Sequence, residues 1–284
     1  MSDRPNEMGR TSSAQPPVGQ STATIAYGAR SRPDEFWNRF LWVLLYALAM
    51  AWVEAAVVLD LRTLAGQMNP YPPQPVPGPP IVERAELVRE AATLLMLGSV
   101  GWLAGRTWRS RLAYALVAFG VWDVCYYLFL KILTGWPNSC LDWDILFLLP
   151  LPWWGPVLAP VLIALLMISG GALVARFDSS ARPFWPKPRS LALNFCGGAL
   201  ALYVFMADAI CAFGQGIQAL KDILPVSFNW PLFVVALGLM AVPVVELAAR
   251  ARRQPASAEP GGLRSSPPRH PSISSTVNPG TPSL

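Results

Sequence analysis

Residues 112–133 read LAYALVAFGVWDVCYYLFLKIL, a run of 22 residues that contains two charged side chains, Asp123 and Lys131. About 20 predominantly apolar residues are enough for a helix to cross the hydrocarbon core of a bilayer. Backbone groups in lipid have no water to bond, so a spanning segment of this composition has to be helical. The stretch therefore predicts a transmembrane helix that carries polar groups inside the membrane.

Five more apolar segments of similar length flank this one, at 38–59, 84–104, 155–175, 190–213 and 229–249. Over the whole chain 53% of the residues are apolar and 14% are charged, whereas a soluble domain has about 25% charged residues. The mean hydropathy is +0.38. We expect an all-α bundle of six transmembrane helices, which excludes a soluble enzyme, a fibrous protein and a disulfide-rich secreted domain.

The membrane domain is predicted to span residues 35–250, between two polar tails. Residues 1–34 are rich in Ser, Gly, Pro, Gln and Arg, and 251–284 are rich in Ser and Pro. Such compositions cannot bury enough apolar surface to fold, so both tails are expected to be disordered. The first of them lacks the apolar core that a signal peptide would need.

The segment before the fourth predicted helix breaks the pattern. The apolar run from Ile145 to Ala175 is too long for one untilted span, and prolines interrupt it. We expect residues 142–154 to form a short segment that lies at the outer interface or re-enters the membrane, with a kinked helix as the alternative. Broken backbone at membrane depth is tolerated where it lines a cavity, so this segment points to a site.

The orientation follows from the positive charges. Of the 22 Lys and Arg residues, 17 fall in the tails and alternate loops on one side of the predicted membrane. A basic excess marks the cytoplasmic side, so both termini are expected in the cytoplasm. We expect a multi-pass protein of a cell membrane, most simply a bacterial inner membrane. This bias also accounts for the net charge of +5, which therefore does not indicate a nucleic-acid partner.

Several kinds of metal binding and catalysis require residues that the predicted membrane domain does not contain. The single histidine, His270, lies in the second tail, so His-ligated haem, zinc and di-iron sites and Ser-His catalysis are excluded. The chain also has no P-loop and no CxxC pair. We therefore expect no cofactor. Asp142 and Asp144 resemble half of a divalent-cation motif, which leaves a Mg²⁺ site of carboxylates and water chemically open.

Charged groups inside the predicted spans are the strongest functional signal. Each costs about 2.5–3.5 kcal/mol at the membrane centre, so such groups usually face the protein interior. Four acids fall in the middle or outer half of four different predicted helices: Glu54, Glu90, Asp123 and Asp208. Asp123 is followed by Tyr127 and Lys131 at four-residue spacing, which places the three on one helix face.

Two interpretations of these acids stay open. In the structural one, Arg89 pairs with Glu86, Glu90 or Glu54, and Lys131 pairs with an acid such as Asp208, so that ion pairs hold the helices in register. In the functional one, the four acids converge on a pocket that opens to the outside and is capped by 142–154. Such a pocket suits a cation, a proton relay or a lipid-like substrate.

The leading functional hypothesis is a membrane protein that binds or transports a small cationic or proton-coupled solute. The second is a cofactor-free or Mg²⁺-assisted enzyme that acts on a lipid or isoprenoid, with Asp123 or Glu54 as general acid. The third is a structural or assembly subunit without an active site. The expected partners are the lipid bilayer and a small cation, a proton or a lipid-like substrate.

Cysteines and glycines add two structural expectations. Cys140 and Cys211 fall on the predicted outer side, where an oxidising compartment would allow a disulfide between them. Gly101 and Gly105, reinforced by Gly98, have the four-residue spacing of small residues that lets transmembrane helices approach closely, and Gly197, Gly198 and Ala201 do the same in the fifth predicted helix.

Overall fold

The computed structural model describes residues 33–64, 66, 80–147, 152–213 and 227–253. The predicted disordered tails, apart from their innermost residues, lie outside this part of the chain. The described elements are six helices and two short strands: α1 (Pro33–Leu64), α2 (Pro80–Ala104), α3 (Trp108–Thr134), β1 (Trp143–Phe147), β2 (Trp153–Pro156), α4 (Leu158–Phe177), α5 (Pro188–Phe213) and α7 (Trp230–Arg253).

All six helices are long and apolar enough to cross a membrane. Each coincides with one of the apolar segments of the sequence, so the six expected helices are confirmed within the described residues, in a chain compatible with an integral membrane protein. The largest difference is in α1, which extends five residues beyond the predicted segment 38–59 at each end. The apolar stretch marks the part of a helix that lies in lipid, and the helix continues past it.

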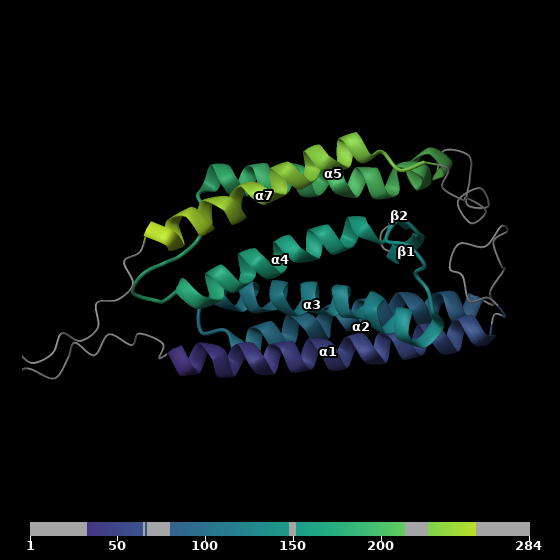
Figure 1. Ribbon diagram of the computed structural model, residues 1–284, viewed down its shortest axis with the longest axis horizontal. Coiled ribbons are helices and arrows are strands. Elements are labelled where there is room, and N and C mark those ends of the chain that lie inside the picture. Colours follow the sequence, from purple (N-terminus) through teal and green to yellow (C-terminus); the bar gives the residue numbers. More distant parts are fainter. Residues whose placement is uncertain (1–32, 65, 67–79, 148–151, 214–226, 254–284) are drawn as a thin grey trace, which may run out of the picture.

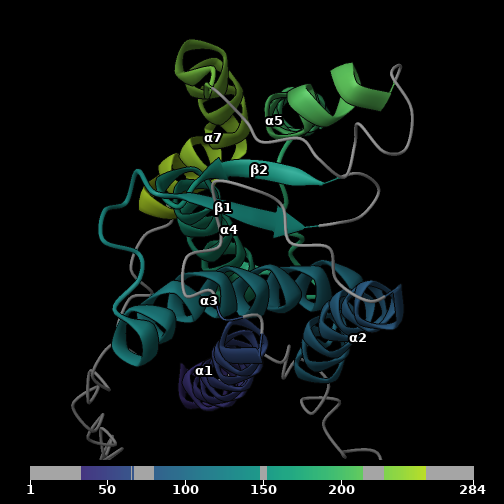
Figure 2. The ribbon, with the colours of Figure 1, turned by 90° about the vertical axis from the view of Figure 1, so that its right-hand side faces the viewer.

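The helices alternate in direction along one long axis (Figure 1). Helix α1 begins and α7 ends at one end of the bundle, here called the terminal end, and the two strands lie at the opposite end, the hairpin end. Viewed from the hairpin end, α1, α2 and α3 form one group, α5 and α7 form a second, and α4 lies between them (Figure 2). Helix α3 contacts α1, α2 and α4, which makes it the centre of the fold.

The segment before α4 folds as a β-hairpin. Strands β1 and β2 pair antiparallel, with Asp144 opposite Gly155, and the register shifts between Ile145 and Phe147. Prolines in this segment disfavour helix, whereas a two-stranded sheet tolerates them because each strand is an edge. A hydrogen bond of 2.9 Å from the backbone N–H of Val157 to the carbonyl of Asp142 joins the hairpin to the start of α4. The sequence predicted a break here but not this conformation.

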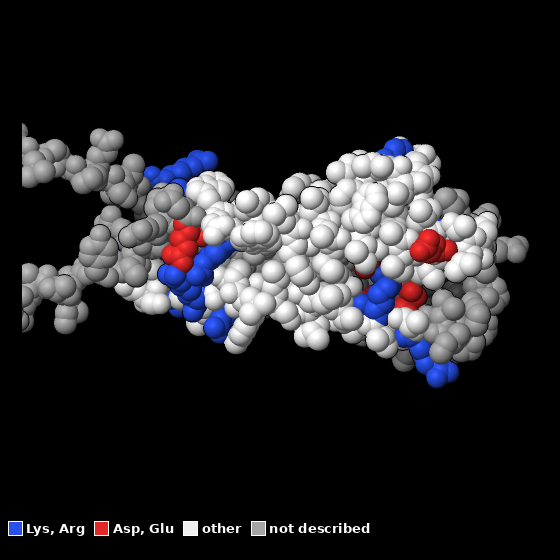
Figure 3. Space-filling view, turned by 90° about the horizontal axis from the view of Figure 1, so that it is seen from below, with Lys and Arg blue, Asp and Glu red and all other residues white. Residues whose placement is uncertain are grey.

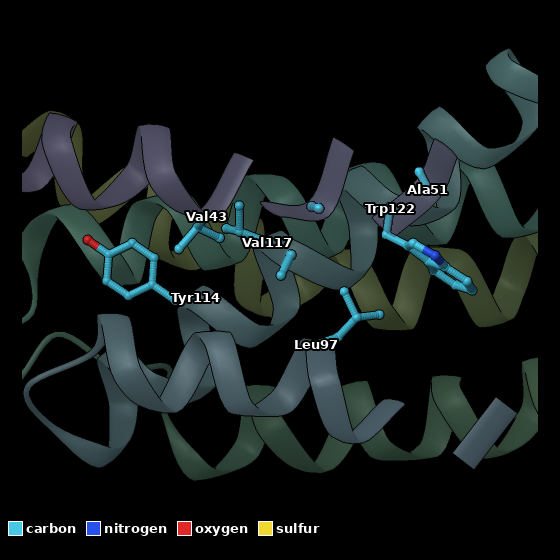
Figure 4. Close-up of a cluster of buried hydrophobic side chains, with 8 residues drawn as sticks. Val43, Ala51, Leu97, Tyr114, Val117 and Trp122 are labelled. Atoms are coloured by element: carbon cyan, nitrogen blue, oxygen red, sulfur yellow. The ribbon is translucent and has the colours of Figure 1, made fainter. Parts of the chain in front are cut away.

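Small residues let the central helices pack tightly. Ala47, Ala51 and Ala55 of α1 are fully buried and recur every four residues, on one face. Figure 4 shows Ala51 near Trp122 of α3, within a cluster of side chains from α1, α2 and α3. Many apolar side chains on the opposite faces are exposed, as is usual where a helix meets lipid rather than water.

The surface is consistent with a membrane belt. In the view from below, charged side chains gather toward the two ends of the molecule, and the broad middle carries none (Figure 3). A charge-free band between two charged ends matches the hydrocarbon core between two headgroup layers.

Two neighbouring glycines of α5, Gly197 and Gly198, differ in how closely another helix approaches them. A Cβ atom on Gly197 would lie 2.6 Å from the backbone carbonyl oxygen of Ala236 on α7, whereas one on Gly198 would meet nothing within 4 Å. Gly197→Ala is therefore expected to force α5 and α7 apart and to destabilise the protein by about 1–3 kcal/mol. Gly198→Ala is expected to be neutral or stabilising by up to about 1 kcal/mol.

The measurement is the thermal unfolding midpoint of each variant in the same detergent. Equal midpoints for the two variants would contradict the close approach of α5 and α7 at Gly197.

Candidate functional site

A cavity of about 140 Å³ lies at the hairpin end of the bundle. Helices α1 to α5 and the hairpin all contribute to its wall. Four acidic residues from four different segments line it: Glu54 of α1, Glu90 of α2, Asp123 of α3 and Asp144 of β1. Arg89 is the one basic residue among the lining residues that the structure describes. The cavity wall is therefore acidic.

Asp123 is a lining acid with a buried carboxylate oxygen that has no hydrogen-bond partner among the described residues. Its side chain is buried, with 8% of the residue exposed, and its Oδ2 atom accepts no hydrogen bond from any described residue. A buried carboxylate oxygen without a donor is costly, which is why such atoms nearly always have a partner. Asp123 is therefore suited to bind a donor or a cation that enters the cavity.

Asp144 belongs to a chain of polar contacts that begins one helical turn above Asp123. The hydroxyl of Tyr127 donates a hydrogen bond to the Asp144 carboxylate. On its other side, Nη2 of Arg62 lies 4.0 Å from Asp144 Oδ1, and the Arg62 guanidinium lies over the ring of Trp136 at 4.5 Å. Burial raises the pKa of Asp144 to about 6, against the opposing effects of Arg62 and of hydrogen bonds from Tyr127 and the Ile145 backbone.

Glu54 and Arg89 form the second polar group of the cavity. The Arg89 guanidinium contacts the carboxylates of both Glu54 and Glu86, with 3.0 Å between its Nε atom and Oε2 of Glu86. Thr93 donates a further hydrogen bond of 3.5 Å to Glu54. These contacts are the ion pairs of the structural interpretation, and they tie α1 to α2. The site therefore contains both the ion pairs of the structural interpretation and several of the acids that the functional interpretation placed around a pocket.

The structure separates the other predicted site residues from the cavity. Asp208 and Lys131 are not among the lining residues, and the Lys131 ammonium donates to the backbone carbonyl of Gly135 at 2.7 Å. The ion pair between them is therefore not formed. Cys140 and Cys211 are exposed free thiols, so the structure does not contain the disulfide that the sequence allowed.

Aromatic rings make up much of the remaining wall. Those that line the cavity come from α3, the hairpin and α5, and they are Phe119, Trp122, Tyr126, Tyr127, Phe147, Trp153 and Phe205. The Phe147 ring lies 5.3 Å from that of Trp153 and 6.5 Å from that of Trp122. Neither indole Nε1 of Trp122 nor that of Trp153 has a hydrogen-bond partner among the described residues. The hairpin thus closes an aromatic wall over the acids.

Sequence reasoning missed the role of the hairpin. It placed Asp144 in a weak external motif with Asp142, and it did not identify Phe147 or Trp153 as wall residues. No local pattern gives this result, because the strand pairing between 143–147 and 153–156 decides which side chains point inward. Asp142, the other half of that motif, instead accepts a hydrogen bond of 2.7 Å from the backbone N–H of Asn138.

The acids of the described segments are spread around the cavity wall rather than gathered in one cluster. No three His, Cys, Asp or Glu residues in the described part of the chain gather closely enough to hold one metal ion. The Mg²⁺ site that the sequence left open therefore has no ligand cluster among these residues.

A second cavity of about 200 Å³ lies at the terminal end, and its charges are balanced. Its wall includes two acids, Glu35 and Asp178, and two bases, Arg39 and Arg106. Arg39 and Arg106 both contact the Glu35 carboxylate. Because its charged groups compensate one another, this cavity is a weaker candidate for a binding site than the acidic one.

Comparisons with protein families, characterised proteins and solved structures gave no match for this chain. The function is therefore inferred from the chemistry of the acidic cavity alone.

Proposed function

We propose that this membrane protein binds a small cation in the cavity at the hairpin end and transports it or couples its binding to protons. The observation that carries the proposal is the convergence of Glu54, Glu90, Asp123 and Asp144 on one cavity, in which Arg89 is the one base among the described lining residues. A wall with more acids than bases favours a positive ligand, and the low dielectric inside a protein strengthens that preference.

The Oδ2 atom of Asp123, which has no hydrogen-bond partner among the described residues, supports a ligand site rather than a purely structural network. Ion pairs that only hold helices together are expected to satisfy every buried charge. Glu54 meets this expectation through Arg89, but Oδ2 of Asp123 does not, among the described residues. A cation in the cavity would provide the missing interaction.

Asp144 supports coupling to protons. Its pKa of about 6 means that the carboxylate is ionised above this pH and protonated below it. A unit charge roughly 8–10 Å away across a cavity is worth about 2 kcal/mol at an effective dielectric of about 20. We therefore expect the protonation of Asp144 alone to lower cation affinity roughly tenfold to thirtyfold as the pH is lowered from 7.5 to 5.

The experiment is calorimetric titration of the full chain in lipid nanodiscs with Na⁺, K⁺, Mg²⁺ and a small alkylammonium ion at pH 5, 6 and 7.5. Saturable binding of one of them, with a proton released near pH 6, is the expected result. Binding that is independent of pH would contradict the role of Asp144. Saturable binding of none would overturn the proposal and favour the enzyme or the assembly subunit.

We further propose that the terminal end faces the cytoplasm, as the distribution of Lys and Arg indicates. Cys140 is exposed near the hairpin end, so a variant that keeps only this cysteine should react with a membrane-impermeant maleimide in intact cells. The matched control adds Ser180→Cys to a cysteine-free chain, because Ser180 is exposed in the loop after α4. It should react only after the membrane is permeabilised. The reverse pattern would show the opposite orientation.

A further inference from the structure

We infer that the cation is a small organic ammonium ion of about six non-hydrogen atoms, held between the Asp123 carboxylate and the aromatic wall. This inference rests on the proposed function and names the class of ligand. Three independent features of the cavity support it: its aromatic lining, its volume and the dispersal of its acids.

The aromatic lining suits an organic cation. Ammonium groups with alkyl substituents bind over the faces of Trp, Tyr and Phe, within about 6 Å of the ring centre, and the attraction grows when water is excluded. Here the rings form a continuous series from Trp122 through Phe147 to Trp153 and Phe205, with 6.3 Å between the last two. A ligand of purely apolar character would leave the Asp123 carboxylate uncompensated.

The volume sets the size of the ligand. An engineered apolar cavity of about 150 Å³ in another protein binds benzene, which has six non-hydrogen atoms. The cavity here has about 140 Å³, so it accommodates a six-atom ring such as piperidinium. A bare metal ion would fill only a small part of it.

The acids are placed for one organic cation rather than for a metal ion. A hard cation such as Mg²⁺ or Ca²⁺ takes six to eight oxygen ligands at 2.0–2.6 Å, so a site for the ion without its water shell requires several protein oxygens gathered at one point. The four lining acids come from four segments, Glu54 is held by Arg89, and the described residues contain no cluster that could hold a metal. Among the buried side-chain atoms of the described residues, Oδ2 of Asp123 is the carboxylate oxygen without a hydrogen-bond partner, which is sufficient for one N–H donor.

The test compares three ligands on the full chain in nanodiscs at pH 7.5. Piperidinium is the probe, the uncharged ring ether tetrahydropyran is the control of equal size, and K⁺ is the inorganic control. Piperidinium is expected to bind saturably, and at least tenfold more tightly than the other two.

Two variants locate the binding. Phe147→Leu removes a ring but keeps an apolar side chain, and it is expected to weaken piperidinium binding about threefold to thirtyfold. Its matched control is Phe195→Leu, because Phe195 lies exposed on α5 and outside the cavity. This control should bind piperidinium as the parent protein does.

The outcomes separate the inference from the function on which it rests. Tight K⁺ binding without piperidinium binding would overturn the organic ligand and leave the cation-binding function standing. Equal binding of tetrahydropyran and piperidinium would overturn the inference, because charge would then contribute nothing. An unchanged affinity in Phe147→Leu would overturn the role of the aromatic wall. Binding of neither cation would overturn the inference, and it would also overturn the proposed function if Na⁺ and Mg²⁺ bind no better.

Discussion

Replacing Asp123 with asparagine is expected to weaken cation binding about 10- to 100-fold while the protein still inserts and folds. The substitution keeps the shape of the side chain but removes the charge. A hydrogen bond that involves a charged group is worth about 1.5–3 kcal/mol, which corresponds to this change in affinity. Because Oδ2 of Asp123 accepts no hydrogen bond from the described residues, the substitution breaks no contact of that atom in the folded protein.

Binding is measured by calorimetry and folding by the thermal midpoint of the same preparation. Asp60→Asn is the matched control, since Asp60 lies exposed near the hairpin end of α1 and outside the cavity. It should bind the cation as the parent protein does. A loss of folded protein in Asp123→Asn would favour the structural interpretation of the acid, and an unchanged affinity would remove Asp123 from the site.

Asp178→Ala is expected to destabilise the protein by about 3–5 kcal/mol, without a direct effect on the acidic cavity. The Asp178 side chain is fully buried at the end of α4 and lies 2.6 Å from the Arg109 Nε atom. It also accepts hydrogen bonds of 2.6 Å from the Thr107 hydroxyl and 2.8 Å from the Phe184 backbone N–H. Removing one partner of a buried ion pair leaves the other charge uncompensated, which explains the size of the effect.

Unfolding of Asp178→Ala is followed in parallel with Asp60→Ala, in which an exposed acid is removed. The Asp60 variant should unfold within about 0.5 kcal/mol of the parent. Similar stabilities for the two variants would contradict the role of Asp178 as the link between α3, α4 and the loop before α5.

The helices were predictable from sequence because each is defined by a property of its own residues. Spanning length and apolar composition act locally, so the stretch 112–133 predicts the core of α3 without reference to the rest of the fold. The hairpin was not predictable in the same way. Pro150 and Pro152 indicate that a helix is interrupted there, but strand pairing depends on contacts between 143–147 and 153–156.

The site was predictable only in part, for the same reason. The cost of burying charge in a membrane identified Glu54, Glu90 and Asp123 as residues that face the protein interior, and the three line one cavity. The same argument selected Asp208, but depth in the membrane does not say which way a side chain points around the helix. Asp144 was not predicted to line the cavity, because it lies outside the helices, in a segment whose conformation the sequence did not reveal.

The most direct test of the account is an experimental structure of the full chain determined with saturating piperidinium and again without it. We expect added density inside the hairpin-end cavity, within hydrogen-bond distance of the Asp123 carboxylate and against the rings of Trp122 and Phe147. Density beside Glu35 and Asp178 in the cavity at the terminal end, or no added density in the acidic cavity, would contradict it.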